Sequence, residues 1–261
     1  MTIKRIVKEL LYSIGFDVRR AYSIDPSIPD AAFYRPLFSP WDGFGNFKSY
    51  YEAARPFTVV SPDRCYVLYT LAFQALHLDG QWYEAGVYRG GTAILLAKLL
   101  EENERHEQTK LHLFDTFEGM PETDPRIDRH KKDDFKDTSL EAIRSRLESS
   151  ISDLRVVEFH QGMVPATFEN LTSHQVSFAH VDVDIYRSIK DCCEFIYPRL
   201  QNGGFMVFDD YGFPTCPGAR KAVDEFFEDK PEFPLVLPTG QAVVFRAKNE
   251  NRVRGVTEGS G

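Results

Sequence analysis

The sequence predicts an α/β fold in which helices cover both faces of a mostly parallel β-sheet. Short apolar runs, typical of buried strands, alternate along the chain with longer apolar segments typical of helices. Acidic residues fall at or next to the ends of several runs, as at Glu84, Asp115, Asp182 and Asp209. In an open parallel sheet, ligands bind at the carboxyl ends of the strands. The pattern therefore predicts an architecture and also the edge of the sheet that carries the function.

Turn and capping residues set the limits of the predicted elements. Ser61 followed by Pro62 is typical of a helix start, because proline is favoured at the first helical position. Gly90 and Gly91 open the next helix, and Pro238-Thr239-Gly240 separates the last two strands. The predicted strands are 82–85, 111–114, 154–159, 176–181, 204–208, 233–237 and 242–245, and the predicted helices are 66–78, 93–100, 139–147, 186–197 and 217–227.

The chain is predicted to have three parts. Residues 1–60 are rich in Pro, Tyr and Phe with weak periodicity, and they predict an N-terminal cap or lid that begins with a short amphipathic helix rather than a signal peptide. Residues 61–248 form the regular α/β domain, and residues 249–261 a disordered tail. Within the domain, the charged segment 119–138 is predicted to be a long exposed loop that could close over a site.

Composition excludes several classes of protein. The net charge of −8 argues against a general nucleic-acid binder, which needs a basic face. No apolar run is long enough to span a membrane, so no stable membrane insertion is expected. The four cysteines form no CxxC pair, which indicates neither a zinc site nor a disulfide framework, and a reducing cytoplasm is the expected compartment. The 21 Phe and 12 Tyr fit core packing or an aromatic pocket, and an aromatic cap favours a homo-oligomer.

The segment from Glu84 to Thr92 joins the first predicted strand to its helix. Its glycines let the backbone approach a ligand closely, and the helix N-terminus beyond them favours an anionic group such as a carboxylate. Asp115 ends the second strand, where an acidic side chain can accept both hydroxyls of a ribose, and Phe117 could flank an adenine. A tight turn, a helix cap and a core aromatic are the alternatives. The spacing is not GxGxxG, which argues against a hydride-transfer enzyme.

Four aspartates follow two neighbouring strands of the predicted sheet. Asp182 and Asp184 come after the fourth strand, and Asp209 and Asp210 after the fifth. Carboxylates that converge in this way repel one another, and a hard divalent cation such as Mg²⁺ or Ca²⁺ removes that cost. Individually, Asp184 could instead cap the following helix, and Asp209 or Asp210 could stabilise a turn. Four such explanations together are less favoured than a metal site.

Four motifs in order resemble one family. They are Glu84-Ala-Gly-Val-Tyr-Arg-Gly-Gly-Thr92, Phe114-Asp-Thr-Phe-Glu-Gly-Met-Pro121, His180-Val-Asp-Val-Asp-Ile-Tyr186 and Gly203-Gly-Phe-Met-Val-Phe-Asp-Asp-Tyr-Gly212. From about residue 56 to 246 the chain resembles the macrocin O-methyltransferase family of natural-product sugar O-methyltransferases, the TylF, MycF and NovP group. The resemblance implies a class I methyltransferase fold, Rossmann-like with seven strands, and makes residues 61–248 an S-adenosylmethionine-dependent domain that also uses Mg²⁺.

The resemblance also implies roles for particular residues. Asp182, Asp209 and Asp210 would hold the metal, and Asp184 would be the general base, with His180 and His160 ranked below it. Metal coordination lowers the pKa of a bound hydroxyl, and a nearby carboxylate can take its proton as the methyl group moves. The implied cofactor-binding residues are Thr58, Val59, Glu84, Gly86, Tyr88, Gly90, Gly91, Thr92, Asp115, Thr116, Phe117, Gln161, Gly162 and Asp182.

The leading hypothesis is therefore a metal-dependent O-methyltransferase whose substrate is a small molecule or glycoside with an acceptor hydroxyl. The same carboxylates would serve a methyltransferase for a catechol or another phenolic diol. A third hypothesis is a non-catalytic nucleotide-binding protein on the same fold. The intact set of four aspartates argues against that loss of activity.

Overall fold

The computed structural model describes residues 40–42, 45–105 and 107–247, together with Val7, Leu10, Leu11, Ser13 and Ile14. The chain divides into two compact units, residues 1–39 and 40–261, and the elements below belong to the second. Most of the predicted N-terminal helix and the whole predicted tail lie outside the described residues. The extent of a cap over residues 1–60 stays a prediction.

The second unit is built on a seven-stranded sheet, as predicted. Its strand order is β3-β2-β1-β4-β5-β7-β6. Strands β1 to β5 pair in parallel, and β7 runs antiparallel to both of its neighbours. The strands are β1 (Gln81–Ala85), β2 (Leu111–Asp115), β3 (Val157–Gln161), β4 (Val176–Val181), β5 (Leu200–Phe208), β6 (Leu235–Val236) and β7 (Ala242–Phe245).

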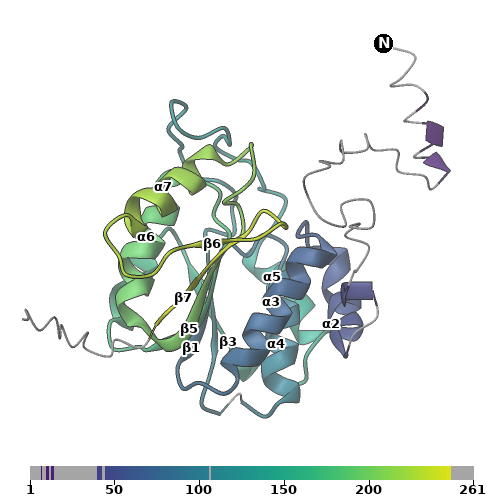
Figure 1. Cartoon of the computed structure of the whole chain (residues 1–261). Helices are drawn as coiled ribbons and strands as arrows, with labels where there is room; N and C mark the ends of the chain where they lie inside the picture. The colour runs from purple at the N-terminus through teal and green to yellow at the C-terminus, as the bar shows by residue number, and fades with distance from the viewer. Residues whose placement is uncertain are drawn as a thin grey trace, which may run out of the picture. The chain divides into compact units, whose positions relative to one another are not determined.

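Helices cover both faces of this sheet (Figure 1). Figure 1 shows α6 and α7 on one side of the sheet, and α2, α3, α4 and α5 on the other. The α-helices are α2 (Phe47–Ala54), α3 (Pro62–Ala75), α4 (Gly91–Glu102), α5 (Leu140–Glu148), α6 (Tyr186–Ile196) and α7 (Pro217–Phe227), and the 3-10 helices are η1 (Pro40–Asp42), η2 (Arg55–Phe57), η3 (Leu154–Val156), η4 (Ala166–Leu171) and η5 (Tyr197–Arg199).

Side chains alternate between the two faces along each strand, and a separate apolar core lies on each face of the sheet. Trp82 of β1 packs in the cluster that includes α3, α4 and α5. Its neighbours Tyr83 and Ala85 pack in the cluster that includes α6 and α7. Successive residues of a strand point to opposite faces, so Glu84 lies on the same face as Trp82.

Three predicted strands differ from the structure by two or more residues at their limits. The strand predicted over 204–208 begins four residues earlier, at Leu200. Residues 154–156 form the 3-10 helix η3, because the side chain of Asp153 accepts a hydrogen bond from the backbone of Arg155 and fixes a turn there. The strand predicted over 233–237 is reduced to Leu235 and Val236.

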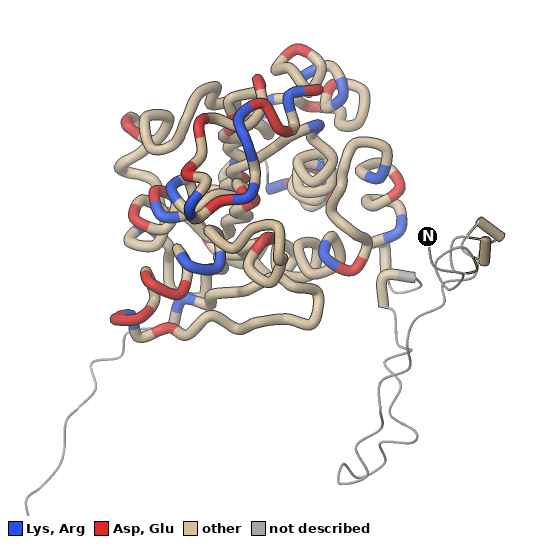
Figure 2. Tube along the Cα trace, turned by 90° about the horizontal axis from the view of Figure 1, so that it is seen from above, with Lys and Arg blue, Asp and Glu red and all other residues tan. Residues whose placement is uncertain are grey.

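Charged residues of both signs are spread along the described chain. In Figure 2, Lys and Arg positions are interspersed with Asp and Glu positions along the Cα trace. Among the described helices, none has the length and apolar character needed to cross a membrane.

Candidate active site

A cavity opens at the carboxyl edge of the sheet, where the sequence predicts ligand binding. Parts of β1, β2, β4 and β5 end there, and segment 119–138 contributes to its wall. Predicted site residues that line the cavity are Val59, Gly86, Tyr88, Asp115, Thr116, Gly162, Asp182, Asp184 and Asp210.

The loop from β1 to α4 depends on two glycines in the left-handed region. Gly86 has φ +86°, and a Cβ added to it would overlap the backbone carbonyl of Asp182. Gly90 has φ +84° and forms the N-cap of α4 without a side-chain cap. The loop therefore lies directly against the end of β4, and the N-terminus of α4 keeps its backbone donors free of a side-chain partner.

Asp115 holds this loop in place from the neighbouring strand. Its Oδ2 accepts hydrogen bonds from the backbone of Val87 (2.7 Å) and Tyr88 (3.0 Å), and its Oδ1 accepts one from Phe117 (2.7 Å). The Thr116 hydroxyl also lies 3.4 Å from Oδ1 and 2.8 Å from the carbonyl oxygen of Gly119, and it can donate its single proton to only one of them. A carboxylate has about four acceptor positions, so about one is open to a ligand hydroxyl when Thr116 donates to Gly119. Asp115 thus organises the loop and still faces the cavity.

Other residues of the predicted cofactor set support the site from behind. Phe117 is buried and packs edge-on against Phe159. These contacts favour a core aromatic over a ring that flanks an adenine. Gly91 lies so close to Thr58 that a Cβ there would meet the Thr58 side chain and backbone. Thr92 is buried in α4. Gln161, at the end of β3, and Gly90 are not among the residues that line the cavity.

Behind the cavity wall, a buried chain of charges crosses the strand ends. Oε1 of Glu84 lies 2.9 Å from Nδ1 of His180, and the other ring nitrogen lies 3.6 Å from Oδ1 of Asp209. Asp209 also accepts a hydrogen bond from Nε2 of Gln241 (2.8 Å) and forms an ion pair with Arg64. Burial opposes the charged imidazole, but Asp209 and Glu84 raise the pKa of His180 to about 10. We call these five residues the inner layer; of the five, Arg64 also lines the cavity.

The inner layer is close to neutral. It combines two carboxylates with the His180 imidazolium and the Arg64 guanidinium. Burial would raise the pKa of Asp209, but His180 and Arg64 hold it below its usual value. His180 is fully buried and does not line the cavity, so the geometry assigns it to support rather than to a base acting on a ligand.

Three further carboxylates, which we call the outer layer, face the cavity: Asp182, Asp184 and Asp210. The pKa values of Asp182 and Asp184 both lie well above the usual range. Burial is the main cause for each. The charges of Asp209 and Asp210 add to it for Asp182, and the charge of Asp210 adds to it for Asp184. Burial and Asp209 raise the pKa of Asp210 to about 6. Clustered carboxylates of this kind are stabilised by protons or by a cation.

The outer layer offers the oxygen donors that Mg²⁺ and Ca²⁺ prefer. Asp182 and Asp210 would present them to the cavity. Asp209, the third predicted ligand, is fully buried, and Gln241 and Arg64 hold its oxygens. Its part in a metal site stays a prediction and requires one of these contacts to be exchanged.

Asp184 is not a helix cap. Ile185 occupies the N-cap position of α6, and Oδ1 of Asp128 accepts the hydrogen bond of the Tyr186 backbone (2.9 Å). Asp184 itself has φ +57°, and its backbone donates to Oδ2 of Asp210 (3.1 Å). A non-glycine residue in this region is strained, and such residues gather at functional sites.

His130 is a cavity residue that the sequence analysis missed. Its Nε2 lies 3.5 Å from Oδ1 of Asp184, and its Nδ1 lies 3.1 Å from Oδ2 of Asp134. The signal that could have found it is its place in segment 119–138, the loop predicted to close over the site. His160, one of the two histidines proposed as a base, instead contacts His112 and does not line the cavity.

The loop that carries His130 is tied to the domain at several points. Asp128 binds the start of α6, and the hydroxyl of Thr138 donates to the backbone carbonyl of Tyr88. Phe135 packs edge-on against the Tyr88 ring at 5.3 Å. Met120, Pro121, His130, Phe135 and Thr138 of this segment line the cavity.

Comparison with protein families gives a match over most of the domain. The model of the macrocin O-methyltransferase (TylF) family matches residues 69–246.

Curated relatives align over a little more than half of the chain. A tetracenomycin-C 4'-O-methyltransferase of Streptomyces olivaceus is 30% identical over 158 residues, 57% of this chain and 58% of that protein. The demethyldecarbamoylnovobiocin O-methyltransferase of Streptomyces niveus is 27% identical over 157 residues, 58% of this chain and 59% of that protein. The mycinamicin III 3''-O-methyltransferase of Micromonospora griseorubida is 28% identical over 158 residues. The alignments thus span about 58–61% of the relatives' lengths.

Solved structures share the fold. The O-methyltransferase NovP superposes with a TM-score of 0.66 at 22% identity, covering 74% of this chain and 83% of NovP. The calicheamicin methyltransferase CalS11 superposes with a TM-score of 0.63 at 17% identity, covering 88% and 99%. The fold is therefore that of class I, Rossmann-like methyltransferases.

Proposed function

Because the chain belongs to the macrocin O-methyltransferase family, we propose that it transfers a methyl group from S-adenosylmethionine to a hydroxyl group of a sugar or glycosylated small molecule. The observation that carries the proposal is one cavity that holds both Asp115 with the Gly86 loop and the three carboxylates of the outer layer. The first set suits a nucleoside with an anionic end, and the second suits an acceptor hydroxyl.

The cofactor binds along the β1–α4 loop in this proposal. Asp115 accepts a ribose hydroxyl, and the free backbone donors at the start of α4 favour the carboxylate of the methionine end. Gly86 keeps the wall beside Asp182 free of a side chain. A cofactor bound there would bring its sulfonium methyl group toward the outer layer, and alignment with the acceptor oxygen would then provide much of the rate enhancement.

We propose that Asp182, Asp209 and Asp210 hold a magnesium ion. When bound, such an ion lowers the pKa of a coordinated hydroxyl. Asp184 takes the hydroxyl proton, since its carboxylate faces the same cavity as Asp182 and Asp210 and is not assigned to the metal. His130, 3.5 Å away, holds the Asp184 carboxylate in place.

A sugar acceptor is proposed from the relatives. The protein of Streptomyces olivaceus is named for methylation of a rhamnosyl tetracenomycin, and that of Micromonospora griseorubida for mycinamicin III. The alignments cover only part of the length of each relative. We therefore propose no acceptor more specific than a hydroxyl group on a sugar. The reducing cytoplasm remains the proposed compartment, and the four cysteines are buried as free thiols. A homo-oligomer stays a prediction.

The test uses the full chain with S-adenosylmethionine, Mg²⁺ and a panel of glycosides and phenolic diols. We expect S-adenosylhomocysteine and a methylated glycoside, detected by mass spectrometry, and loss of both after chelation of the metal. Methylation of the phenolic diols alone would contradict the sugar acceptor. Absence of S-adenosylmethionine and S-adenosylhomocysteine binding by calorimetry would contradict the proposal as a whole.

A further inference from the structure

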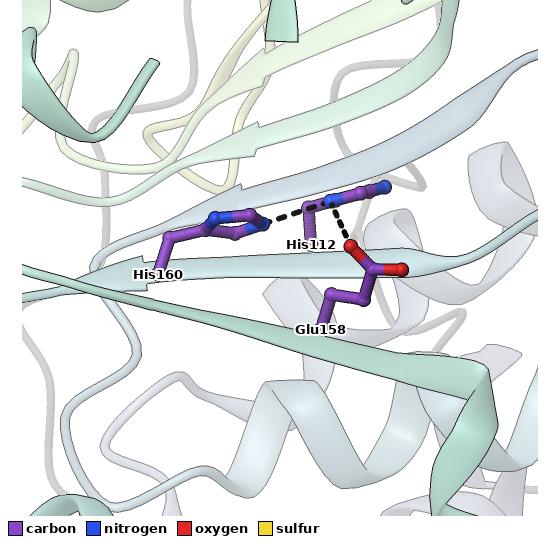
Figure 3. Close-up of side chains that lie close together, drawn as sticks. All are labelled: His112, Glu158 and His160. Atoms are coloured by element: carbon purple, nitrogen blue, oxygen red, sulfur yellow. Dashed lines mark hydrogen bonds and ion pairs between the residues drawn. The ribbon is translucent and has the colours of Figure 1, made fainter. Parts of the chain in front are cut away.

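A second cluster of metal-ligating side chains lies on β2 and β3, outside the cavity. Figure 3 shows His112, Glu158 and His160 pointing toward one another from these two strands. Nδ1 of His112 lies 2.9 Å from Nε2 of His160 and 3.6 Å from Oε2 of Glu158. One ligand atom from each residue lies within 4.8 Å of the other two. None of the three residues lines the cavity of the proposed active site.

The strand pairing holds the cluster together. In the parallel register, His112 pairs with Glu158, and Phe114 pairs with His160. Glu158 and His160 are two residues apart on β3 and so share one face of the sheet. The ring of Phe114 stacks on that of His160 at 4.5 Å, and Tyr83 packs on His112 at 5.2 Å. Side chains on regular strands with packed rings are positioned before any ligand arrives.

The cluster is in the protonation state that a metal requires. Burial lowers the pKa of His112 to about 3 and also lowers that of His160. The hydrogen bond from Lys110 lowers the pKa of Glu158. Uncharged imidazoles and an ionised carboxylate are the forms that bind a metal, so these directions agree with the geometry of the cluster.

We propose that His112, Glu158 and His160 form a binding site for a divalent transition-metal ion of the zinc type, separate from the aspartate site. Imidazole nitrogens with one carboxylate suit Zn²⁺, whereas Mg²⁺ prefers oxygen donors alone. Ligand atoms around a tetrahedral zinc, bonded at about 2.05 Å, lie about 3.3 Å apart. The two observed separations, 2.9 and 3.6 Å, lie on either side of this value. The Glu158 side chain is 41% exposed, which gives the ion a route from solvent and room for a water ligand.

A metal-free network competes with the ion for the same atoms. His112 can donate from Nδ1 to Nε2 of His160, and Lys110 lies 2.7 Å from Oε1 of Glu158. When zinc binds Nδ1 of His112, the proton of this neutral imidazole moves to Nε2 of the same ring, which is buried and has no hydrogen-bond partner of its own. Oε1 of Glu158 stays with Lys110, while Oε2 faces the ion. The two descriptions differ in what they predict for zinc affinity.

The experiment measures zinc binding by the full-length, metal-free protein against a chromophoric chelator, with excess Mg²⁺ present to occupy the aspartate site. Glu158→Gln and His160→Gln change ligands on the exposed side of the cluster. Glu148→Gln and His77→Gln are matched controls at exposed positions on α5 and after α3. Thermal unfolding of each metal-free variant verifies that it is folded.

We expect one zinc ion bound by the wild type and by both controls. Loss of a supporting partner costs about 10–100-fold in metal affinity, so loss of a ligand should weaken binding by at least about 100-fold in both ligand variants. Equal affinity in Glu158→Gln, His160→Gln and the wild type would overturn the proposal. Zinc binding that is lost with Asp182→Asn instead would also overturn it, because the ion would then lie in the aspartate site. None of these readouts depends on methyl transfer.

Discussion

Gly86→Ala tests whether the close contact between the β1–α4 loop and the end of β4 is rigid. Gly86 has φ +86°, and an added Cβ would overlap the carbonyl oxygen of Asp182. Left-handed backbone costs a residue with a Cβ about 1–2 kcal/mol, and forcing an extra carbon into a packed region adds about 1–3 kcal/mol. We therefore expect a loss of about 2–5 kcal/mol in the free energy of unfolding. For a domain of this size, about 2–4 °C per kcal/mol gives a fall in Tm of about 4–20 °C.

Gly203→Ala is the matched control. Gly203 has φ +85°, but a Cβ there would meet the side chain of Leu78 at 3.5 Å, an ordinary contact. It carries the backbone cost alone, about 1–2 kcal/mol. Calorimetric melting of the two variants isolates the contact with Asp182, and cation affinity of the folded Gly86→Ala protein shows whether Asp182 has moved. A Tm for Gly86→Ala no lower than that for Gly203→Ala would refute the reasoning.

Three further predictions address charges. Asp184→Asn should lower kcat by about 10²–10⁴-fold while S-adenosylhomocysteine affinity stays within about twofold, and wild-type turnover would assign the base elsewhere. Arg64→Ala should strengthen Mg²⁺ binding about tenfold in calorimetry by freeing an oxygen of Asp209, whereas unchanged affinity would exclude Asp209 as a ligand. Burial lowers the pKa of His112 to about 3 in the folded protein, whereas a histidine in the unfolded chain has a pKa near 6.5. As the pH falls, His112 is therefore protonated in the unfolded chain before it is protonated in the folded protein. Stability should be complete above about pH 6.5 and fall as pH decreases toward 3, and His112→Asn should flatten that decline between pH 6.5 and 4.5 in denaturant titrations.

The sheet can be predicted from the sequence because its signals are local. Apolar runs of four to six residues mark buried strands such as β2 and β4, and glycines mark the turn before α4. The convergence of the aspartates followed from topology alone, because β4 and β5 pair in parallel and end at one edge. The start of β3 was predicted too early, since an apolar pattern does not show that Asp153 binds the backbone of Arg155.

The orientation of each carboxylate could not be predicted from spacing. Asp209 and Asp210 are adjacent, yet one turns inward and the other toward the cavity. Asp209 turns inward because Arg64 of α3 and Gln241, which precedes β7, reach it from segments 145 and 32 residues away. His130 was missed for a related reason, because the conformation of segment 119–138 is set by irregular contacts such as that between Asp128 and the start of α6.

The two layers of charge differ in how far their own residues balance the carboxylates. In the inner layer, His180 and Arg64 compensate Glu84 and Asp209, so this part of the strand ends is stable with no added ion. In the outer layer, burial and then the charge of neighbouring aspartates raise the pKa of each carboxylate, so the ionised form is disfavoured there. A cation bound at the outer layer would therefore be stabilised more by carboxylate charge than a cation bound at the inner layer. Asp209 stands at the boundary, since it raises the pKa of both Asp182 and Asp210 while its own oxygens are held from behind. Exchange of Arg64 for the cation would turn an oxygen of Asp209 toward the outer layer, and metal affinity would then depend on Arg64, which lines the cavity without being a metal ligand.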